Sequence, residues 1–193
     1  DAACVDATHD HRSRESHLHR TPVVFPDGTT VTAVSFGSAD PYARSVAPDF
    51  GLYLDERWAP PWPHECLDWP DFSVPADPAV VVTALGALRQ RARSGEQVEI
   101  GCYGGHGRTG TALACLAVIC GQPPEDAATW VRSAYCERAV ETDDQEAFVR
   151  TLAAHMGRAA AFFIDYGFPE AEYYHPQRSG GTLMCHRAHR ADT

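Results

Sequence analysis

A short buried strand that runs through a glycine-rich turn into an apolar helix constrains the fold of this chain more than any other feature. Residues 98–102, "VEIGC", have the mostly apolar character of a short buried strand. Residues 109–120 are apolar on nearly every side, and Gly121 and Pro123 beyond them end the helix. Because a helix that is apolar all round belongs in the centre of a domain, we expect a domain built around this unit.

The remaining patterns predict a single α/β domain. Asp77 and Pro78 suit the cap and first position of a helix, and the prolines within 57–77 rule out a helix there and indicate a long loop. The other predicted elements are strands at 30–37 and 50–55 and helices at 77–95, 124–136 and 142–162. We therefore expect a central mixed or parallel sheet of about four or five strands, flanked by helices, with the glycine-rich loop between a strand and a helix.

The two ends of the chain are predicted to lie outside this domain. Residues 1–20 predict a flexible arm, 21–162 the folded catalytic domain and 163–193 a C-terminal extension. The ends carry residues that superficially resemble a metal site: His9, His11, His17, His19, Cys185, His186 and His189. No pair of them has a standard zinc-finger spacing, so we interpret them as solvated tails.

The composition limits the classes of function. The formal charge is −10 and no basic patch is evident, so we expect no binding to nucleic acid or to an anionic membrane. The longest strongly apolar run, 111–120, is too short for the ~20 residues of a membrane span, and no signal peptide is evident. Irregularly spaced cysteines do not form a disulfide framework, and the lack of lysine and asparagine indicates GC-rich coding. We expect a cytoplasmic bacterial protein.

The strand, turn and helix together predict an anion-binding loop. The unpaired amides of the turn and of the first helical turn would point inward, with the positive end of the helix dipole behind them. Arg108 at the end of the turn could bind two oxygens of a phosphate at once. Cys102 at its start would share the positive field, which favours the thiolate and places a nucleophile against a bound phosphate.

Several motifs carry a resemblance to a known family. The stretch "CYGGHGRTG" (102–110) resembles the Cys-x5-Arg-Ser/Thr phosphate-binding loop of the cysteine-dependent protein tyrosine phosphatase superfamily. The stretch "WPDFSVP" (69–75) is similar to the family's Trp-Pro-Asp loop, and "AVETDDQEAFV" (139–149) to its glutamine-bearing loop. The motifs stand in family order over roughly residues 22–157, with the short spacing typical of bacterial dual-specificity-like members.

The resemblance implies a role for each matching residue. Cys102 would attack phosphorus and form a phosphocysteine, while Arg108 holds the equatorial oxygens. Asp71 would protonate the leaving group and later accept a proton from water, Thr109 would donate to the departing sulfur, and Gln145 would position the water. The phosphate-binding loop would comprise Tyr103, Gly104, Gly105, His106, Gly107 and Arg108. The resemblance implies no metal and no other cofactor.

A few residues depart from the family pattern. Gly101 stands where a histidine usually precedes the nucleophile, which removes a support of the loop, and His106 could partly replace its positive influence. Ser73 replaces a glycine that follows the aspartate, which would stiffen the acid loop. Glu141 replaces the first glutamine of many members, so water positioning would depend on Gln145 alone.

Simpler structural roles compete with several assignments. Asp71 could be only a turn residue, and Thr142 with Gln145 could form only a helix capping box. Cys66 could form a protective disulfide with an oxidised Cys102, although a packed thiol is the simpler interpretation. The thiols interpreted as inert are Cys115, Cys120 and Cys136. The aromatic residues that could form a lip for a substrate, or only cover the core edge, are Trp58, Trp62, Trp69 and Phe72.

The resulting hypothesis is a phosphomonoester hydrolase that resembles a protein tyrosine or dual-specificity phosphatase, with a phosphorylated protein as its partner. A phosphatase for a small molecule such as an inositol phosphate, a lipid or a nucleotide ranks second, because the loop carries Tyr103 and His106 rather than several basic residues. A pseudophosphatase that binds phosphate without turnover stays open. A rhodanese-type sulfurtransferase would leave Asp71 without a role. The sequence does not indicate an oligomeric state.

Overall fold

The computed structural model of the chain describes residues 19–152, 185–187 and 190–192. The chain divides into two units, Asp1–Met156 and Gly157–Thr193. In the second unit, the strands β6 (Cys185–Arg187) and β7 (Arg190–Asp192) pair in antiparallel orientation. The first unit contains the sheet, the helices and the glycine-rich loop. The domain limits at residues 20 and 162 stay predictions.

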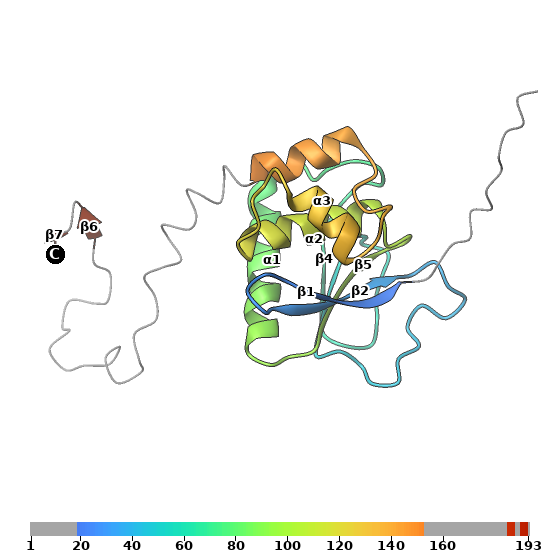
Figure 1. The fold of residues 1–193 in the computed structure, drawn as a ribbon. Coiled ribbons are helices and arrows are strands. Elements are labelled where there is room, and N and C mark those ends of the chain that lie inside the picture. The colour runs from blue at the N-terminus through green and yellow to red at the C-terminus, as the bar shows by residue number, and fades with distance from the viewer. Residues whose placement is uncertain (1–18, 153–184, 188–189, 193) are drawn as a thin grey trace, which may run out of the picture. The chain divides into compact units, whose positions relative to one another are not determined.

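A five-stranded sheet forms the centre of the first unit (Figure 1). Its order is β1-β2-β5-β3-β4; the β1–β2 pair is antiparallel and the other pairs are parallel. The strands are β1 (Arg20–Val24), β2 (Thr30–Ser35), β5 (Val98–Cys102), β3 (Phe50–Tyr53) and β4 (His64–Cys66). The predicted α/β fold with a mixed central sheet is confirmed.

The edge strand β4 lies within the segment 57–77 that the prolines predict to be a loop. Hydrogen bonds attach it to β3 at both ends, from Gly51 N to the Pro63 carbonyl (3.0 Å) and from Leu67 N to the Tyr53 carbonyl (2.8 Å). Proline excludes a helix and a central strand, but it allows a short strand at a sheet edge. The prediction of a continuous loop was therefore wrong at β4.

The helices pack together around α2 (Figure 1). They are α1 (Pro78–Arg93), α2 (Gly107–Ile119), α3 (Ala127–Ala134) and a helix over residues 143–152. Asp77 caps α1 through a hydrogen bond from Ala79 N (2.9 Å), and Pro78 begins the helix as predicted. The end of the predicted helix 142–162 lies outside the described residues. Within the described ranges, no helix is long and apolar enough to cross a membrane.

Alternate residues of the central strands face two different cores. Leu52, Leu54 and Ile100 belong to the main core, which also contains the inner faces of α1, α2 and α3. Tyr53, between the two leucines, faces a second core with Phe36 and an aromatic layer that includes Trp62, Tyr42 and Trp58. The sheet is thus buried on both faces, as is usual for parallel strands.

A buried ion pair fixes the loop between β2 and β3 to the sheet. Glu99 on β5 is 3% exposed, and Arg44 holds both of its carboxylate oxygens at 3.0 Å. The Tyr53 hydroxyl donates to the same carboxylate (2.6 Å) and accepts a hydrogen bond from Trp62 Nε1 (2.5 Å). Burial, with the Glu99 charge beside it, raises the pKa of Tyr53 far above its usual value.

We expect Arg44→Ala to destabilise the protein by about 3 to 5 kcal/mol, because it leaves the buried Glu99 carboxylate without its counter-ion. Chemical denaturation followed by circular dichroism measures this loss. The matched control is Arg93→Ala, whose exposed pair with Asp27 has a 3.9 Å separation and is worth about 1 kcal/mol or less. Equal losses in the two variants would contradict this account of the buried pair.

Candidate functional site

The glycine-rich turn folds into a loop around the Cys102 sulfur. Gly105 has φ of +75°, a conformation that glycine adopts readily, and its amide donates to Cys102 Sγ at 3.3 Å. The Thr109 hydroxyl donates to the same sulfur at 3.0 Å. The start of the loop is held by β2, because Phe36 N donates to the carbonyls of Cys102 (3.2 Å) and Tyr103 (3.0 Å).

The Cys102 sulfur is buried and faces hydrogen-bond donors. The residue is 3% exposed, and both hydrogen bonds to its sulfur come from donors. It lies just before α2, whose cap residue His106 makes no side-chain hydrogen bond to the first helical turn. The positive end of the helix dipole and the donors therefore favour an anion bound beside the sulfur.

Arg108 donates hydrogen bonds to the protein through Nη1 and makes none to the described residues through Nε. Its Nη1 donates to the carbonyls of Leu54 (3.0 Å) and Trp69 (3.1 Å) and lies 3.3 Å from Asp55 Oδ2. Its Nε is buried and has no hydrogen-bond partner in the part of the chain that the structure describes; Asp71 Oδ1 is 3.3 Å away but not aligned. A buried donor without a partner is costly, so Nε is available to a ligand.

Asp55 is a site residue that the sequence analysis missed. It follows β3, is 7% exposed, and forms a buried pair with Arg108. Hydrogen bonds from Arg57 (2.6 and 2.8 Å) lower the pKa of the Asp55 carboxyl to about 2, and the Arg108 charge contributes to the shift. A signal was present, since carboxyl ends of neighbouring parallel strands meet at one edge of a sheet and β3 is next to β5.

The structure brings Asp71 next to the loop. Its side chain is 63% exposed, with one oxygen 3.3 Å from Arg108 Nε. The preceding Trp69 anchors the segment in the core, because it is 2% exposed and its indole donates to the Ser73 carbonyl (2.9 Å). Phe72 has φ of 54°, which is unusual for a residue with a side chain and shows local strain beside the acid.

Gln145 connects the acid loop with the segment before the last described helix. It is 0% exposed, its Oε1 accepts from Glu141 N (2.8 Å), and its Nε2 is 3.5 Å from the Ser73 carbonyl. Thr142 Oγ1 accepts from Gln145 N (3.2 Å), so a capping arrangement is present. These contacts give Gln145 a structural role, and its predicted part in water positioning stays a prediction.

Glu141, which the sequence analysis noted only as a replacement for a family glutamine, lies beside the phosphate-binding loop. Its carboxylate lies beside Gly107, because a Cβ built on that glycine would be 2.2 Å from Glu141 Oε2. Burial raises the pKa of Glu141, and the nearby Asp71 carboxylate raises it further. The preceding Val140 has φ of 61°, a strained value for a β-branched residue, so the backbone holds Glu141 in this position at a cost.

Close packing against β2 explains why a glycine stands at position 101, which the resemblance to the family did not explain. A Cβ at this position would lie 2.5 Å from the carbonyl oxygen of Val34 on β2, which is a backbone atom and cannot turn away. We therefore expect Gly101→Ala to reduce the free energy of unfolding by about 1 to 3 kcal/mol. Chemical denaturation would show this as a lower midpoint. Gly86→Ala, where a Cβ meets nothing within 4 Å, is the control, and it should be neutral or stabilising. A neutral Gly101→Ala would contradict this explanation.

The interpretation of His19 as part of a solvated tail was wrong. It is 8% exposed, its Nε2 lies 3.2 Å from His106 Nδ1, and its ring packs against Tyr135. His106, 8% exposed, therefore directs Nδ1 to His19 and to the Cys136 sulfur (3.5 Å). The other terminal histidines and Cys4 lie outside the described residues, as do the side chains of the second unit.

The predicted aromatic lip is wrong for two of its members. Trp62 and Trp69 are buried in the two cores, whereas Phe72 is 64% exposed beside Asp71. Tyr103 in the phosphate-binding loop is 53% exposed, and its ring lies parallel to that of Trp58, with centroids 6.4 Å apart. Trp62 and Trp69 thus follow the alternative of covering the core, whereas Phe72 stays available to a substrate and Tyr103 was not in the expected set.

The predicted inert thiols are buried. Cys115 and Cys120 lie in the main core, and burial raises the pKa of the Cys120 thiol to about 12. Cys66 donates to the Trp58 carbonyl (3.3 Å) and packs against the second core, in agreement with the packed-thiol interpretation. Cys66, Cys102, Cys115, Cys120 and Cys136 form no disulfide. The Cys136 sulfur differs from the others because it lies 3.5 Å from His106 Nδ1.

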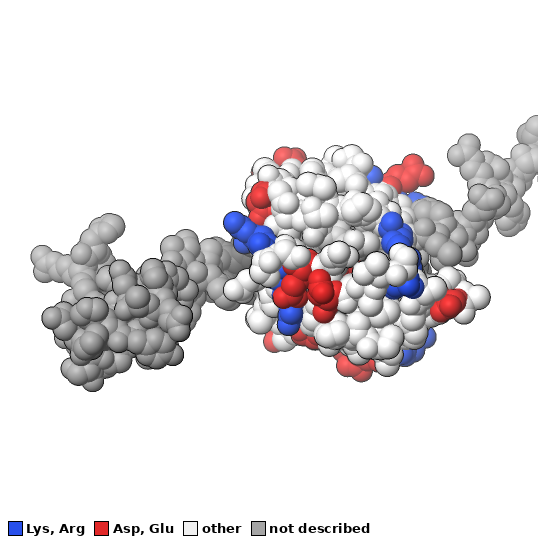
Figure 2. Space-filling model, turned by 90° about the horizontal axis from the view of Figure 1, so that it is seen from below, with Lys and Arg blue, Asp and Glu red and all other residues white. Residues whose placement is uncertain are grey.

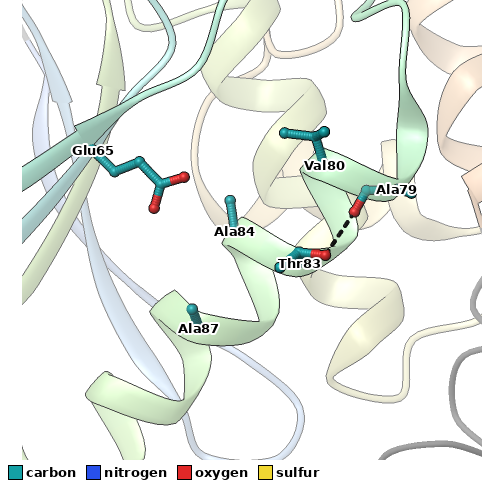
Figure 3. A pocket seen from close by; sticks show the side chains of 6 residues that line it. All are labelled: Glu65, Ala79, Val80, Thr83, Ala84 and Ala87. Atoms are coloured by element: carbon teal, nitrogen blue, oxygen red, sulfur yellow. Dashed lines mark hydrogen bonds between the residues drawn. The ribbon is translucent and has the colours of Figure 1, made fainter.

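Two hollows in the described surface differ in chemistry. The first lies beside the phosphate-binding loop and is lined by Arg57, Arg108, Asp55, Glu56, Asp68, Trp69, Pro70 and Asp71. The second lies between β4 and α1 and is lined by alanines, Val80 and Thr83, with Glu65 as its one charged residue (Figure 3). The dashed bond in that view joins the Thr83 hydroxyl to the Ala79 carbonyl (2.9 Å) and belongs to the helix. The first hollow alone adjoins a nucleophile.

One family model matches a stretch of the chain that contains both the Asp71 loop and the phosphate-binding loop. Residues 67–158 match the model of the DSP-PTPase phosphatase domain described as a Swiss Army Knife protein. A model of S-adenosyl-L-methionine-dependent methyltransferases matches residues 137–193, which exclude Cys102 and are described only in part. The uncharacterized protein MJECL20 of Methanocaldococcus jannaschii is 37% identical over 111 residues, which cover 51% of this chain and 71% of that protein. That relative is archaeal, and the bacterial origin stays a prediction.

Solved structures of phosphatases share the fold. A kinase-associated phosphatase, in a form whose catalytic-site cysteine is replaced by serine, has a TM-score of 0.58 and is 16% identical, over 73% of this chain and 96% of that chain. Human DUSP28 has a TM-score of 0.54 and is 14% identical, over 74% of this chain and 99% of that chain. At these identities the likeness extends to the fold.

Proposed function

We propose that the chain is a member of the cysteine-dependent protein tyrosine phosphatase superfamily, because a phosphatase-domain model matches residues 67–158, and that it hydrolyses phosphomonoesters through a phosphocysteine on Cys102. One observation carries this proposal. The Cys102 sulfur accepts hydrogen bonds from Gly105 N and Thr109 Oγ1, in the loop whose Arg108 Nε is buried and has no hydrogen-bond partner among the described residues. A nucleophile and a vacant anion donor in one loop are what phosphoryl transfer requires.

In the first step, the Cys102 thiolate attacks phosphorus. An S–P bond forms while the P–O bond to the leaving group breaks, and Asp71 gives its proton to the leaving oxygen. Arg108 Nε and the amides of the loop bind the equatorial oxygens, whose charge they stabilise throughout the transfer. Asp55 acts as a positioning residue, because its contact with Arg108 Nη1 keeps the guanidinium turned with Nε free.

In the second step, water attacks the phosphocysteine. The S–P bond breaks, inorganic phosphate leaves, and the water proton passes to the Asp71 carboxylate, which restores the acid for the next turnover. The Thr109 hydroxyl, 3.0 Å from the sulfur, stabilises the departing thiolate. The Glu141 carboxylate lies near this chemistry, since it is beside Gly107 of the loop.

The charges around the loop favour a singly phosphorylated substrate. The hollow beside it contains the carboxylates of Asp55, Glu56, Asp68 and Asp71 against the guanidinium groups of Arg57 and Arg108. An inositol polyphosphate would meet repulsion there, whereas an aromatic phosphate ester would contact the exposed Tyr103 and Phe72. On the face shown in Figure 2, basic side chains lie in separate groups among acidic ones, so this face offers no continuous basic surface to nucleic acid.

Asp71→Asn tests the acid role. We expect kcat for phenyl phosphate to fall by about 10²- to 10³-fold, and the loss of activity at alkaline pH that we expect of the wild type to be absent, since asparagine has no proton to lose. The loss should be smaller for para-nitrophenyl phosphate, whose leaving group needs less protonation. Asp68→Asn, an exposed carboxylate in the same hollow, is the control. If both variants keep the alkaline limb, Asp71 is not the acid.

The pseudophosphatase alternative has a distinct outcome. A wild-type protein that binds a phosphotyrosyl peptide stably under reducing conditions, without release of inorganic phosphate, would be a binding module. We expect release instead, because Cys102, Arg108 and Asp71 are brought together around one loop.

A further inference from the structure

Two imidazoles and a thiol converge at the phosphate-binding loop. His19 comes from the segment before β1, His106 from the phosphate-binding loop, and Cys136 from the turn after α3. All three are buried, and their donor atoms lie within 4.8 Å of one another. They come from three separate parts of the chain, so no sequence spacing could indicate the cluster.

The distances within this cluster are those of ligands around one metal ion. His19 Nε2 is 3.2 Å from His106 Nδ1, which is 3.5 Å from Cys136 Sγ. With Zn–N of about 2.0 to 2.1 Å and Zn–S of about 2.3 Å, tetrahedral coordination places two nitrogens about 3.3 Å apart and a nitrogen and a sulfur about 3.6 Å apart. Two of the three edges therefore already have the coordinated length.

Hydrogen bonding accounts for these contacts less well. His106 Nδ1 carries either one proton or one lone pair, so it makes one good hydrogen bond, yet it faces both the His19 nitrogen and the Cys136 sulfur. A metal ion bound between the three atoms would satisfy them together. Two imidazoles and one thiolate form a donor set that suits Zn²⁺.

We propose that His19 Nε2, His106 Nδ1 and Cys136 Sγ bind a divalent transition metal, with Zn²⁺ as the expected ion. The fourth coordination position of the metal is left for another ligand. On binding, the Cys136 thiol loses its proton to solvent and a metal–sulfur bond forms. The ion is structural, since the nucleophile lies elsewhere in the loop. It would fix the phosphate-binding loop through His106, beside Tyr135, whose hydroxyl donates to the Gly105 carbonyl (2.7 Å).

Cobalt substitution tests this site without measuring activity. The reduced, metal-free full-length protein is titrated with Co²⁺, and the thiolate-to-cobalt charge-transfer absorption is recorded. We expect one tightly bound ion per chain, with the band retained in Cys102→Ser and in the buried control Cys120→Ser, and lost in Cys136→Ser. Loss of a residue that only hydrogen-bonds to a metal ligand lowers metal affinity by about 10- to 100-fold. We expect His19→Gln to lower the Co²⁺ affinity by more than this.

X-ray absorption of the zinc-loaded wild type provides a second measurement that does not depend on a variant. One sulfur and at least two nitrogen neighbours are expected. Binding that survives Cys136→Ser but not Cys102→Ser would assign the metal to the nucleophile and overturn the proposal. A charge-transfer band that persists in both variants would also overturn it, and so would a folded wild type that binds no metal. The phosphatase assays use metal-free enzyme, so either proposal can fail alone.

Discussion

Replacement of Cys102 by serine is expected to lower kcat/KM for aryl phosphates by about 10⁴-fold or more. The hydroxyl would take the place of a sulfur that accepts hydrogen bonds from Gly105 N and Thr109 Oγ1, but it does not ionise at neutral pH and so is a far weaker nucleophile. Binding of inorganic phosphate should persist, because the amides and Arg108 remain. Steady-state kinetics and phosphate binding, measured on the same preparation, separate these effects.

The control for this variant is Cys66→Ser. Cys66 is a half-buried thiol that donates to the Trp58 carbonyl and faces the second core, and burial raises its pKa. We expect its replacement to leave kcat/KM within about threefold of wild type. Residual activity of Cys102→Ser above a few per cent would contradict the account, since it would place the nucleophile elsewhere.

Arg108→Lys is expected to reduce kcat/KM by about 10³-fold. The guanidinium uses Nη1 to hold the Leu54 and Trp69 carbonyls and keeps Nε for a ligand, whereas a lysine ammonium cannot make both sets of contacts from one point. Most of the loss should appear in kcat, because the arginine stabilises charge that is greatest in the transition state.

Arg57→Lys is the matched control for Arg108→Lys. Arg57 lines the same hollow and is paired with Asp55, but its side chain is 73% exposed. A surface pair contributes about 0 to 1 kcal/mol, so we expect at most about a fivefold change in kcat/KM. Similar losses in the two variants would show that general positive charge matters rather than the geometry of Arg108.

The local part of the site is predictable from sequence, because one continuous stretch builds it. Cys102, Thr109 and Arg108 lie within a strand, a turn and a helix start, and their relative positions follow from that short connection. The mixed sheet follows from the same patterns of apolar residues and turns. Strand β4 escaped prediction because its pairing with β3 depends on tertiary contacts rather than on its own residues.

The parts of the site that come from distant segments could not be predicted in the same way. Glu141 lies beside Gly107 and follows Val140, whose strained backbone conformation no residue pattern indicates. His19 belongs to a stretch whose composition is that of a polar tail, but β1 continues directly from it and brings it against His106. Burial of this kind depends on the complete fold.

The most direct test of phosphoryl transfer to Cys102 is to trap the intermediate. The enzyme is mixed with para-nitrophenyl phosphate and quenched in acid within milliseconds. It is then digested, and the masses of its peptides are measured by mass spectrometry. We predict one additional phosphoryl group on the peptide that contains Cys102, at a higher level in Asp71→Asn if water attack slows more than formation. Product released at the wild-type rate with no phosphorylated Cys102 peptide at any quench time would contradict the mechanism.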